Sequence, residues 1–194
     1  VDVAEAAMIF ELQKVGLKLV DGQQIMLDAR ELKNIDEVTL LNQAASMVDG
    51  VYHMIYEELK PGVRENDIVA KANKMLYEMG SDDVEAINAI SGERCSPHPH
   101  NFTDRYFRPG DQAFFDILQS FVGYRTCYYR TFNIGKANDA QNDAYKQCRE
   151  WLDNAIDLIK PGVSTDKVAS VWPKAEEFGF PSEMDAFGLQ FGHG

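Results

Sequence analysis

The sequence has few residues of several informative kinds. Its three cysteines, Cys95, Cys127 and Cys148, are an odd number, which argues against a disulfide framework and for a reducing compartment. Its apolar runs stay short of the roughly 20 residues that span a bilayer, which argues against a membrane partner. Basic residues number 19 against 31 acidic ones, and the net charge of −12 argues against binding to nucleic acid. We therefore expect a cytoplasmic protein.

The chain does contain an internal repeat. Lys60-Pro61-Gly62-Val63 returns 100 residues later as Lys160-Pro161-Gly162-Val163. An amphipathic stretch precedes each copy, over residues 41–58 and 141–159. This pattern predicts two related halves, each with a long helix that Lys-Pro-Gly ends.

The likeness continues after each copy of this motif. A helical pattern follows over residues 67–79 and 166–178, and each ends at a glycine, Gly80 or Gly179. Pro173 interrupts or caps the second of these helices. Further along, each half reaches a strand-like segment that carries histidine. Two halves of this kind predict a shared cleft with histidines from both.

Strands and an amino-terminal region complete the predicted organisation. Val84 to Ile90, Gln112 to Gln119, Arg125 to Ile134 and Phe187 to Phe191 are predicted strands. Before residue 37 we predict a helix over 2–14, a strand–turn–strand unit over 17–27, and a charged connector over 28–34. A long helix over 35–58 follows.

Histidines and one aspartate are the first candidates for chemistry. His98 and His100 flank Pro99. They are either two solvated loop side chains or, if the segment is extended, two side chains that point into one cleft. Asp116 lies in an apolar strand, where a carboxylate is costly unless it is paired, protonated or bound to metal. A structural salt bridge from Asp116 to Arg125 or Arg130 is the alternative to a functional role.

Three further residues also have both a functional and a structural interpretation. Cys127, on the next strand, is by its pattern more typical of an inert buried thiol. Arg130 lies among aromatic residues and should bind a carboxylate, which could be Asp116, another side chain or a substrate. His193 stands between glycines, where the backbone comes close to another group.

Taken together, these motifs resemble the creatinase/aminopeptidase P/methionine aminopeptidase superfamily. The resemblance covers roughly residues 28 to 194 and rests on the duplicated halves and several short motifs. These are His100-Asn101, Gly110-Asp111 before Asp116, Gly123-Tyr124 before Arg130-Thr131-Phe132, and Phe191-Gly192-His193-Gly194.

The resemblance implies a pita-bread fold of class α+β, with duplicated α–β halves around a curved antiparallel sheet. Residues 1–36 would then be the end of a smaller amino-terminal domain and its connector. Residues 37–194 would be an incomplete pita-bread catalytic domain, truncated after the histidine motif.

The metallopeptidase branch of this superfamily implies two metal ions held by two aspartates, a histidine and two glutamates. Asp116 matches the first aspartate and His193 the histidine, and the glutamates would follow Gly194. The second aspartate falls at position 127, where this chain has Cys127. A thiol is a poor ligand for Mn²⁺ and a tolerable one for Zn²⁺ or Fe²⁺. Asp116, Cys127 and His193 are thus candidate ligands for at most one divalent ion (Zn, Fe or Mn), or for none.

The creatinase branch implies a different use of the same cleft. Creatinase lacks the metal aspartates and hydrolyses a C–N bond with a histidine as general acid and base, and His100 matches that histidine. The closest match is therefore a creatinase-like hydrolase with an altered metal site, acting on an amide, amidine or peptide-like C–N bond. His100 and His193 would be catalytic, and Arg130 and His98 would bind substrate.

Three alternatives remain open from the sequence. One is an Xaa-Pro aminopeptidase or dipeptidase with a modified metal site, and another is a dimethylsulfoniopropionate-type lyase of the same fold. The third is a non-catalytic binding module. For the enzyme we expect a small molecule or a short peptide as substrate, and a homodimer as the assembly.

Overall fold

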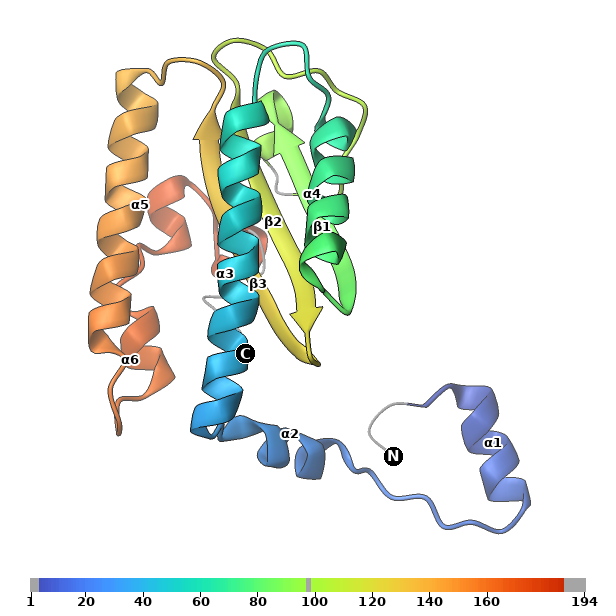
Figure 1. Ribbon diagram of the computed structural model, residues 1–194. Helices are drawn as coiled ribbons and strands as arrows, with labels where there is room; N and C mark the ends of the chain where they lie inside the picture. The colour runs from blue at the N-terminus through green and yellow to red at the C-terminus, as the bar shows by residue number, and fades with distance from the viewer. Residues whose placement is uncertain (1–3, 97–98, 187–194) are drawn as a thin grey trace.

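The computed structural model describes residues 4–96 and 99–186 of the chain (Figure 1). Its strands are β1 (Asp83–Ser91), β2 (Gln112–Phe121) and β3 (Tyr124–Asn133). Its helices are α1 (Ala6–Lys14), α2 (Gln23–Glu31), α3 (Ile35–Glu58), α4 (Glu65–Met79), α5 (Asp139–Leu158), α6 (Thr165–Ala169) and α7 (Glu183–Ala186), with short 3-10 turns η1 (Gly92–Cys95) and η2 (Ala175–Phe178). The predicted α+β class and antiparallel sheet are confirmed.

The three strands form one antiparallel sheet in the order β1-β2-β3. Helix α4 packs against β1, while α3 packs against β2 and β3, so that the two helices cover one face of the sheet (Figure 1). The hydrophobic core lies in this layer, and Ile55, Ile68 and Phe115 are fully buried there. The opposite face of the sheet is the one that carries the candidate site.

Local sequence explains where the two long helices begin. The side chain of Asn34 accepts hydrogen bonds from the first amides of α3, and Glu37 accepts one from the Asn34 amide at 2.7 Å. Asn138 and Gln141 form the same reciprocal cap at the start of α5. Each cap satisfies amides that the helix itself cannot pair.

The repeated Lys-Pro-Gly-Val motif forms the same turn twice. The amide of Val63 donates to the carbonyl of Lys60 at 3.2 Å, and the second copy has the equivalent bond, from Val163 to Lys160, at 3.1 Å. Gly62 and Gly162 lie at φ 88° and 85°, which only glycine adopts readily. The sequence repeat is therefore also a structural repeat.

The predicted strand–turn–strand unit over residues 17–27 is wrong. Residues 17–22 have no regular structure, and helix α2 follows from Gln23. Asp21 Oδ1 accepts a hydrogen bond from the Gln23 amide at 2.8 Å, and the side chains of Gln24 and Asp28 bond one turn apart. The side chain of Asp21 thus accepts a hydrogen bond from the amide of the first residue of α2, and the N-cap is Gly22.

The helical pattern over residues 166–178 is interrupted, as Pro173 predicts. The chain forms α6, then a bend, then η2. Pro173 lies in the bend, where it cannot donate an amide hydrogen bond and where its ring excludes a continuous helix. The glycine at the end of each unit is as predicted, with Gly80 at φ 101° and Gly179 at φ 82°.

The predicted strand over 187–191 lies outside the described residues. The same is true of His98 and His193. Helices α1 and α2 lie away from the sheet (Figure 1), and the boundary predicted between residues 36 and 37 falls in the first turn of α3. Among the helices of the described residues, none has both the length and the apolar character of a membrane span.

Candidate functional site

Polar side chains line up across the sheet on the face away from α3 and α4. In the strand register Asn88 is opposite Asp116, and Asp116 is opposite Tyr129. Since side chains directly opposite in a sheet point to the same side, these three residues form one row. Cys127 lies on the same face, two residues before Tyr129.

Asp116 is the centre of this row and is 2% exposed. Asn88 Nδ2 donates to its Oδ2 at 3.1 Å, and the thiol of Cys127 donates to its Oδ1 at 3.4 Å. The salt bridge considered from the sequence is not formed with the two arginines named, since Arg125 pairs with Glu85 and Arg130 with Asp49. Asp116 is thus a buried carboxylate held by neutral donors.

Burial and the charge of Asp116 set the protonation of its neighbours. Burial, then the charge of Asp116 and the hydrogen bond to it, raise the pKa of Cys127 to about 12. Burial and the same charge raise the pKa of Tyr129 above its ordinary range. The thiol and the phenol therefore both keep their protons at neutral pH, and each can act as a hydrogen-bond donor.

His100 reaches this row from the loop between β1 and β2. Its Nε2 lies 3.4 Å from the hydroxyl of Tyr129, and its side chain is exposed. The structure therefore brings together His100, Asp116 and Cys127, which lie at most 27 residues apart in the sequence. Tyr129, which was not predicted as a site residue, links His100 to the other two. An imidazole beside a phenol is a pair suited to proton transfer.

Arg130 takes a different position from the rest of the predicted site. Its guanidinium lies over the rings of Tyr128 and Tyr52, at 4.7 and 5.7 Å from their centroids, and 3.9 Å from Asp49 Oδ1. These contacts are on the α3 side of the sheet. A substrate-binding role for Arg130 stays a prediction.

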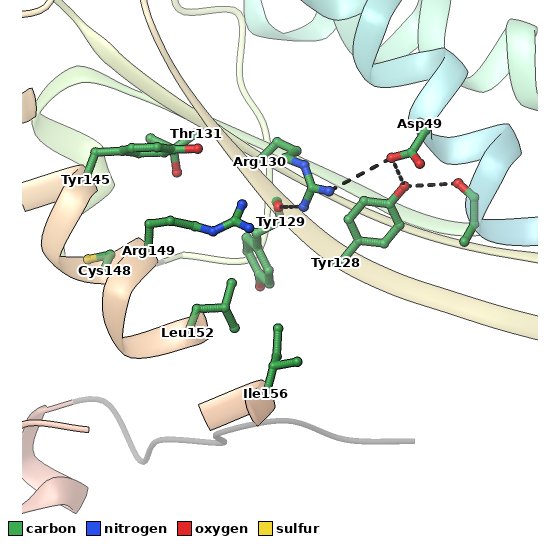
Figure 2. Close-up of a pocket in the computed structure, with 11 residues that line it drawn as sticks. Asp49, Tyr128, Tyr129, Arg130, Thr131, Tyr145, Cys148, Arg149, Leu152 and Ile156 are labelled. Carbon is green, nitrogen blue, oxygen red and sulfur yellow. Dashed lines mark hydrogen bonds and ion pairs between the residues drawn. The ribbon is translucent and has the colours of Figure 1, made fainter. Parts of the chain in front are cut away.

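A cavity of about 580 Å³ connects Arg130 with the row (Figure 2). It lies between β3 and α5, and Tyr129 and Arg130 both line it because β3 is the edge strand of the described sheet. Arg149 and Leu152 of α5 form part of the opposite wall. The cavity is large enough for a small polar ligand.

At position 127 the described residues depart from the two-metal centre that the family resemblance implies. In residues 4–96 and 99–186 no group of three or more His, Cys, Asp or Glu side chains is arranged to hold a metal ion. At position 127 a protonated thiol donates to Asp116 where a second carboxylate would be needed. The prediction of at most one ion stays a prediction.

Asn88 and Tyr129 are the site residues that sequence reasoning missed. Asn88 is a buried amide in an apolar strand, the same signal that singled out Asp116. Tyr129 was one of seven aromatic residues near the two central strands, and most of these pack in or against the core. Its separate role follows from the strand register, which the two-residue turn Val122-Gly123 sets and which the predicted strand ends, Gln119 and Arg125, left open.

Comparisons with known proteins agree with this fold. The chain is 24% identical over 172 residues to an Xaa-Pro dipeptidase from Pyrococcus furiosus, a match that covers 88% of this chain and 49% of that protein. It is 22% identical to an ectoine hydrolase from Halomonas elongata, over 84% of this chain and 44% of the other. The chain thus spans about half the length of these curated relatives.

A solved structure and a family model complete the comparison. The prolidase from Pyrococcus furiosus superposes with a TM-score of 0.81 at 21% identity, over 87% of this chain and 50% of that one. The model of metallopeptidase family M24 matches residues 39–194, which include the whole sheet and His100. This chain belongs to metallopeptidase family M24.

Proposed function

We propose that the protein hydrolyses a C–N bond of a small substrate, with His100 as general acid and base. The observation that carries this proposal is the 3.4 Å contact between His100 Nε2 and the Tyr129 hydroxyl, beside the buried carboxylate of Asp116. A histidine, a protonated phenol and a buried carboxylate thus follow one another in contact on one face of the sheet. This set can move protons without a metal-bound water.

The proposed reaction adds water across the C–N bond. His100 takes a proton from water as the oxygen attacks the carbon of the amide or amidine. The phenol of Tyr129 donates a hydrogen bond, which stabilises the charge that develops. His100 then returns the proton to the leaving nitrogen, the C–N bond breaks, and the amine departs. The charge of Asp116 favours a cationic group on the substrate.

Cys127 and one relative support a creatinase-like reaction over two-metal peptide hydrolysis. The thiol of Cys127 donates to Asp116, so the pair offers one carboxylate where two are implied by the family pattern. One relative of this chain is an ectoine hydrolase, whose name gives a small molecule as substrate. His98, Arg130 and His193 belong to the proposal as further site residues.

An Xaa-Pro dipeptidase is the second candidate. This candidate is favoured because relatives that match most of this chain are named Xaa-Pro dipeptidase, among them the one from Pyrococcus furiosus. A substrate panel separates the two candidates. Small amides and amidines are offered beside Xaa-Pro dipeptides, with and without added Mn²⁺, Fe²⁺ or Zn²⁺, and turnover confined to the dipeptides would replace the first proposal by the second.

Replacement of His100 tests the proposed mechanism. We expect His100→Ala to lower kcat by about 10²- to 10⁴-fold, the usual contribution of a general acid and base, with the fold unchanged by circular dichroism. His53→Ala is the matched control, because His53 is an exposed residue of α3 and its side chain pairs with Glu57. Equal activity of the two variants would contradict the mechanism.

Size-exclusion chromatography with light scattering tests the proposed homodimer, and cell fractionation tests the proposed cytoplasmic location.

A further inference from the structure

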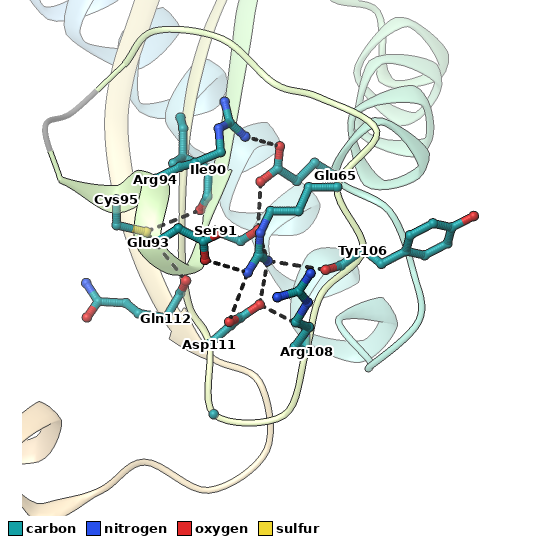
Figure 3. A network of polar contacts seen from close by, with 12 residues as sticks. Glu65, Ile90, Ser91, Glu93, Arg94, Cys95, Tyr106, Arg108, Asp111 and Gln112 are labelled. Atoms are coloured by element: carbon teal, nitrogen blue, oxygen red, sulfur yellow. Dashed lines mark hydrogen bonds and ion pairs between the residues drawn. The ribbon is translucent and has the colours of Figure 1, made fainter.

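A buried carboxylate, Glu65, lies at the start of α4 within a network of polar contacts (Figure 3). Glu65 is 0% exposed, and its two oxygens accept four hydrogen bonds. Ser91 Oγ donates at 2.7 Å, Arg94 Nη1 at 2.7 Å, and Thr103 donates from its amide at 2.9 Å and from its hydroxyl at 2.8 Å. A buried charge with this many donors is stable where it is and costly to neutralise.

The donors to Glu65 lie on both sides of His100 in the sequence. Arg94 also donates from Nη2 to the side chain of Asn101 at 2.7 Å, and the Asn101 carbonyl accepts from the Ala89 amide at 3.0 Å. Asn101 is the neighbour of His100 and Ala89 the neighbour of Asn88. The chain of contacts thus runs from Glu65 through Arg94 to the residue next to His100.

The same network holds the far end of the loop. Arg105 Nη1 donates to Ser91 Oγ at 2.9 Å and pairs with Asp111 Oδ2 at 2.5 Å, just before β2. The amide of Glu65 donates to the carbonyl of Arg105 at 3.0 Å. The loop between the two strands is therefore tied to α4 at several points, and Glu65 takes part in most of them.

His100 depends on such an anchor because its own side chain is exposed. An exposed loop residue has no core packing to fix it, so its position follows from the backbone beside it. At 3.4 Å, the His100–Tyr129 contact is already at the long end of the hydrogen-bond range. A displacement of about 1 Å would break it and can lower a rate by about 10²-fold.

We propose that Glu65 is a positioning residue for His100, acting through Arg94 and Asn101. The proposal rests on the proposed function for its effect on catalysis, but the anchoring of the loop can be tested without any substrate. Glu65 touches neither the row of site residues nor the cavity, and its contacts lead to the loop and, through Ser91, to the end of β1.

Hydrogen exchange tests the anchor directly. Glu65→Gln keeps the shape of the side chain and removes its charge, and Arg94→Gln cuts the link to Asn101 while Ser91 and Thr103 still donate to Glu65. We expect faster exchange at residues 99–104 in both variants, with α3 and β2 unchanged. Glu58→Gln is the matched control, since Glu58 pairs with Lys71 between α3 and α4 and does not contact the loop. Unchanged exchange at 99–104 in Glu65→Gln would overturn the proposal.

Kinetics then test whether the anchor acts on His100. We expect Glu65→Gln to lower kcat by about tenfold or more while KM stays within about twofold, because a misplaced acid–base group affects chemistry more than binding. In the double variant with His100→Ala the loss should equal that of His100→Ala alone. Losses that multiply would overturn a role through His100.

The outcomes separate this proposal from the proposed function. If His100→Ala is fully active but Glu65→Gln loosens the loop, the proposed mechanism fails and the anchor stands. If His100→Ala is inactive and Glu65→Gln leaves both exchange and kcat unchanged, the mechanism stands and the anchor fails. Arg94→Gln gives the same decision should Glu65→Gln fail to fold.

Discussion

The two copies of the repeat begin alike and are buried very differently. Helix α3 of the first copy buries Ala44, Met47, Val48, Val51, Tyr52 and Ile55, whereas α5 of the second copy buries Ala155. At the positions 100 residues after the buried ones, α5 has Ala144, Gln147, Cys148, Trp151, Leu152 and Ala155. Five of these six are apolar, so the helical pattern is kept.

The difference lies in what covers each helix. In the first copy β2 and β3 pack on the apolar face of α3. In the described residues no strand packs on α5, and its Leu152 and Ile156 remain 43% and 53% exposed. Helix formation is thus local, set by caps and pattern, while burial depends on a sheet formed by distant residues.

The largest expected contrast is between two isoleucines. Ile55→Ala should lower the free energy of unfolding by about 2 to 5 kcal/mol, since Ile55 is fully buried and leaves a cavity. Ile156→Ala should change it by at most about 0.5 kcal/mol, because that side chain is half exposed. Urea denaturation followed by circular dichroism measures both, and equal losses would contradict the contrast.

The next contrast is between two ion pairs. Arg105 and Asp111 are 11% and 13% exposed, so Asp111→Asn should cost about 2 to 3 kcal/mol at pH 7. Arg149 and Asp153 are exposed on α5, and Asp153→Asn should cause no measurable loss of stability. The control for both is the unfolding curve of the unmodified protein.

The pH dependence of stability tests the same pair of substitutions. Burial opposes the charge of Asp111, but hydrogen bonds from Arg105 and from the Arg108 amide prevail and lower the pKa of Asp111 below its ordinary value. A lowered folded-state pKa means that the stabilisation is present above the ordinary pKa near 4 and is lost as the pH falls through the folded value. The cost of Asp111→Asn should therefore shrink as the pH falls below about 4. A cost that grows there would contradict this assignment.

The helix caps should behave alike in the two copies. Asn34→Ala and Asn138→Ala each remove the acceptor of a reciprocal cap, at α3 and α5. Each should destabilise its helix by about 1 kcal/mol, because capping is local and does not depend on the sheet. Hydrogen exchange at the first turn of each helix measures the change. A loss in α3 without one in α5 would show that the comparison is wrong at this level.

The smallest expected effect concerns two thiols and leaves stability unchanged. Burial, then the charges of Glu65 and Asp111, raise the pKa of Cys95 to about 11, whereas Cys148 is exposed on α5. Because the thiolate is the reactive form, Cys148 should react with iodoacetamide at pH 8 at least about tenfold faster than Cys95. Mass spectrometry of the labelled peptides gives the two rates. Equal rates would show that Cys95 is not held as described.

Most of the fold could be predicted from the sequence because its signals are local. The long helices follow from apolar spacing and caps, and the strands from apolar runs between turn residues. The main error is over residues 17–27, where helix α2 begins at Gln23 and a hairpin was expected. Pro173 divides the helical pattern over 166–178, as expected.

The candidate site was predicted less completely because it depends on strand register. Asp116 and His100 could be identified from their types and from the family resemblance. That Tyr129 stands opposite Asp116, and that Arg130 faces α3 on the other side, follows from the alignment of β2 with β3, which the two-residue turn Val122-Gly123 sets. The predicted strand ends, Gln119 and Arg125, left the length of this turn open. The network around Glu65 was missed because its members are spread over residues 65 to 111.

The stoichiometry of bound metal tests the central claim most directly, namely that the thiol of Cys127 converts a two-metal centre into a site based on His100 and Tyr129. Elemental analysis of the purified protein, after incubation with Zn²⁺, Fe²⁺ or Mn²⁺ and gel filtration, counts the ions per chain, with Cys127→Asp as the comparison. We expect at most one ion per chain in the natural protein and a gain of metal in Cys127→Asp. Two ions at full occupancy in the natural protein would contradict the account.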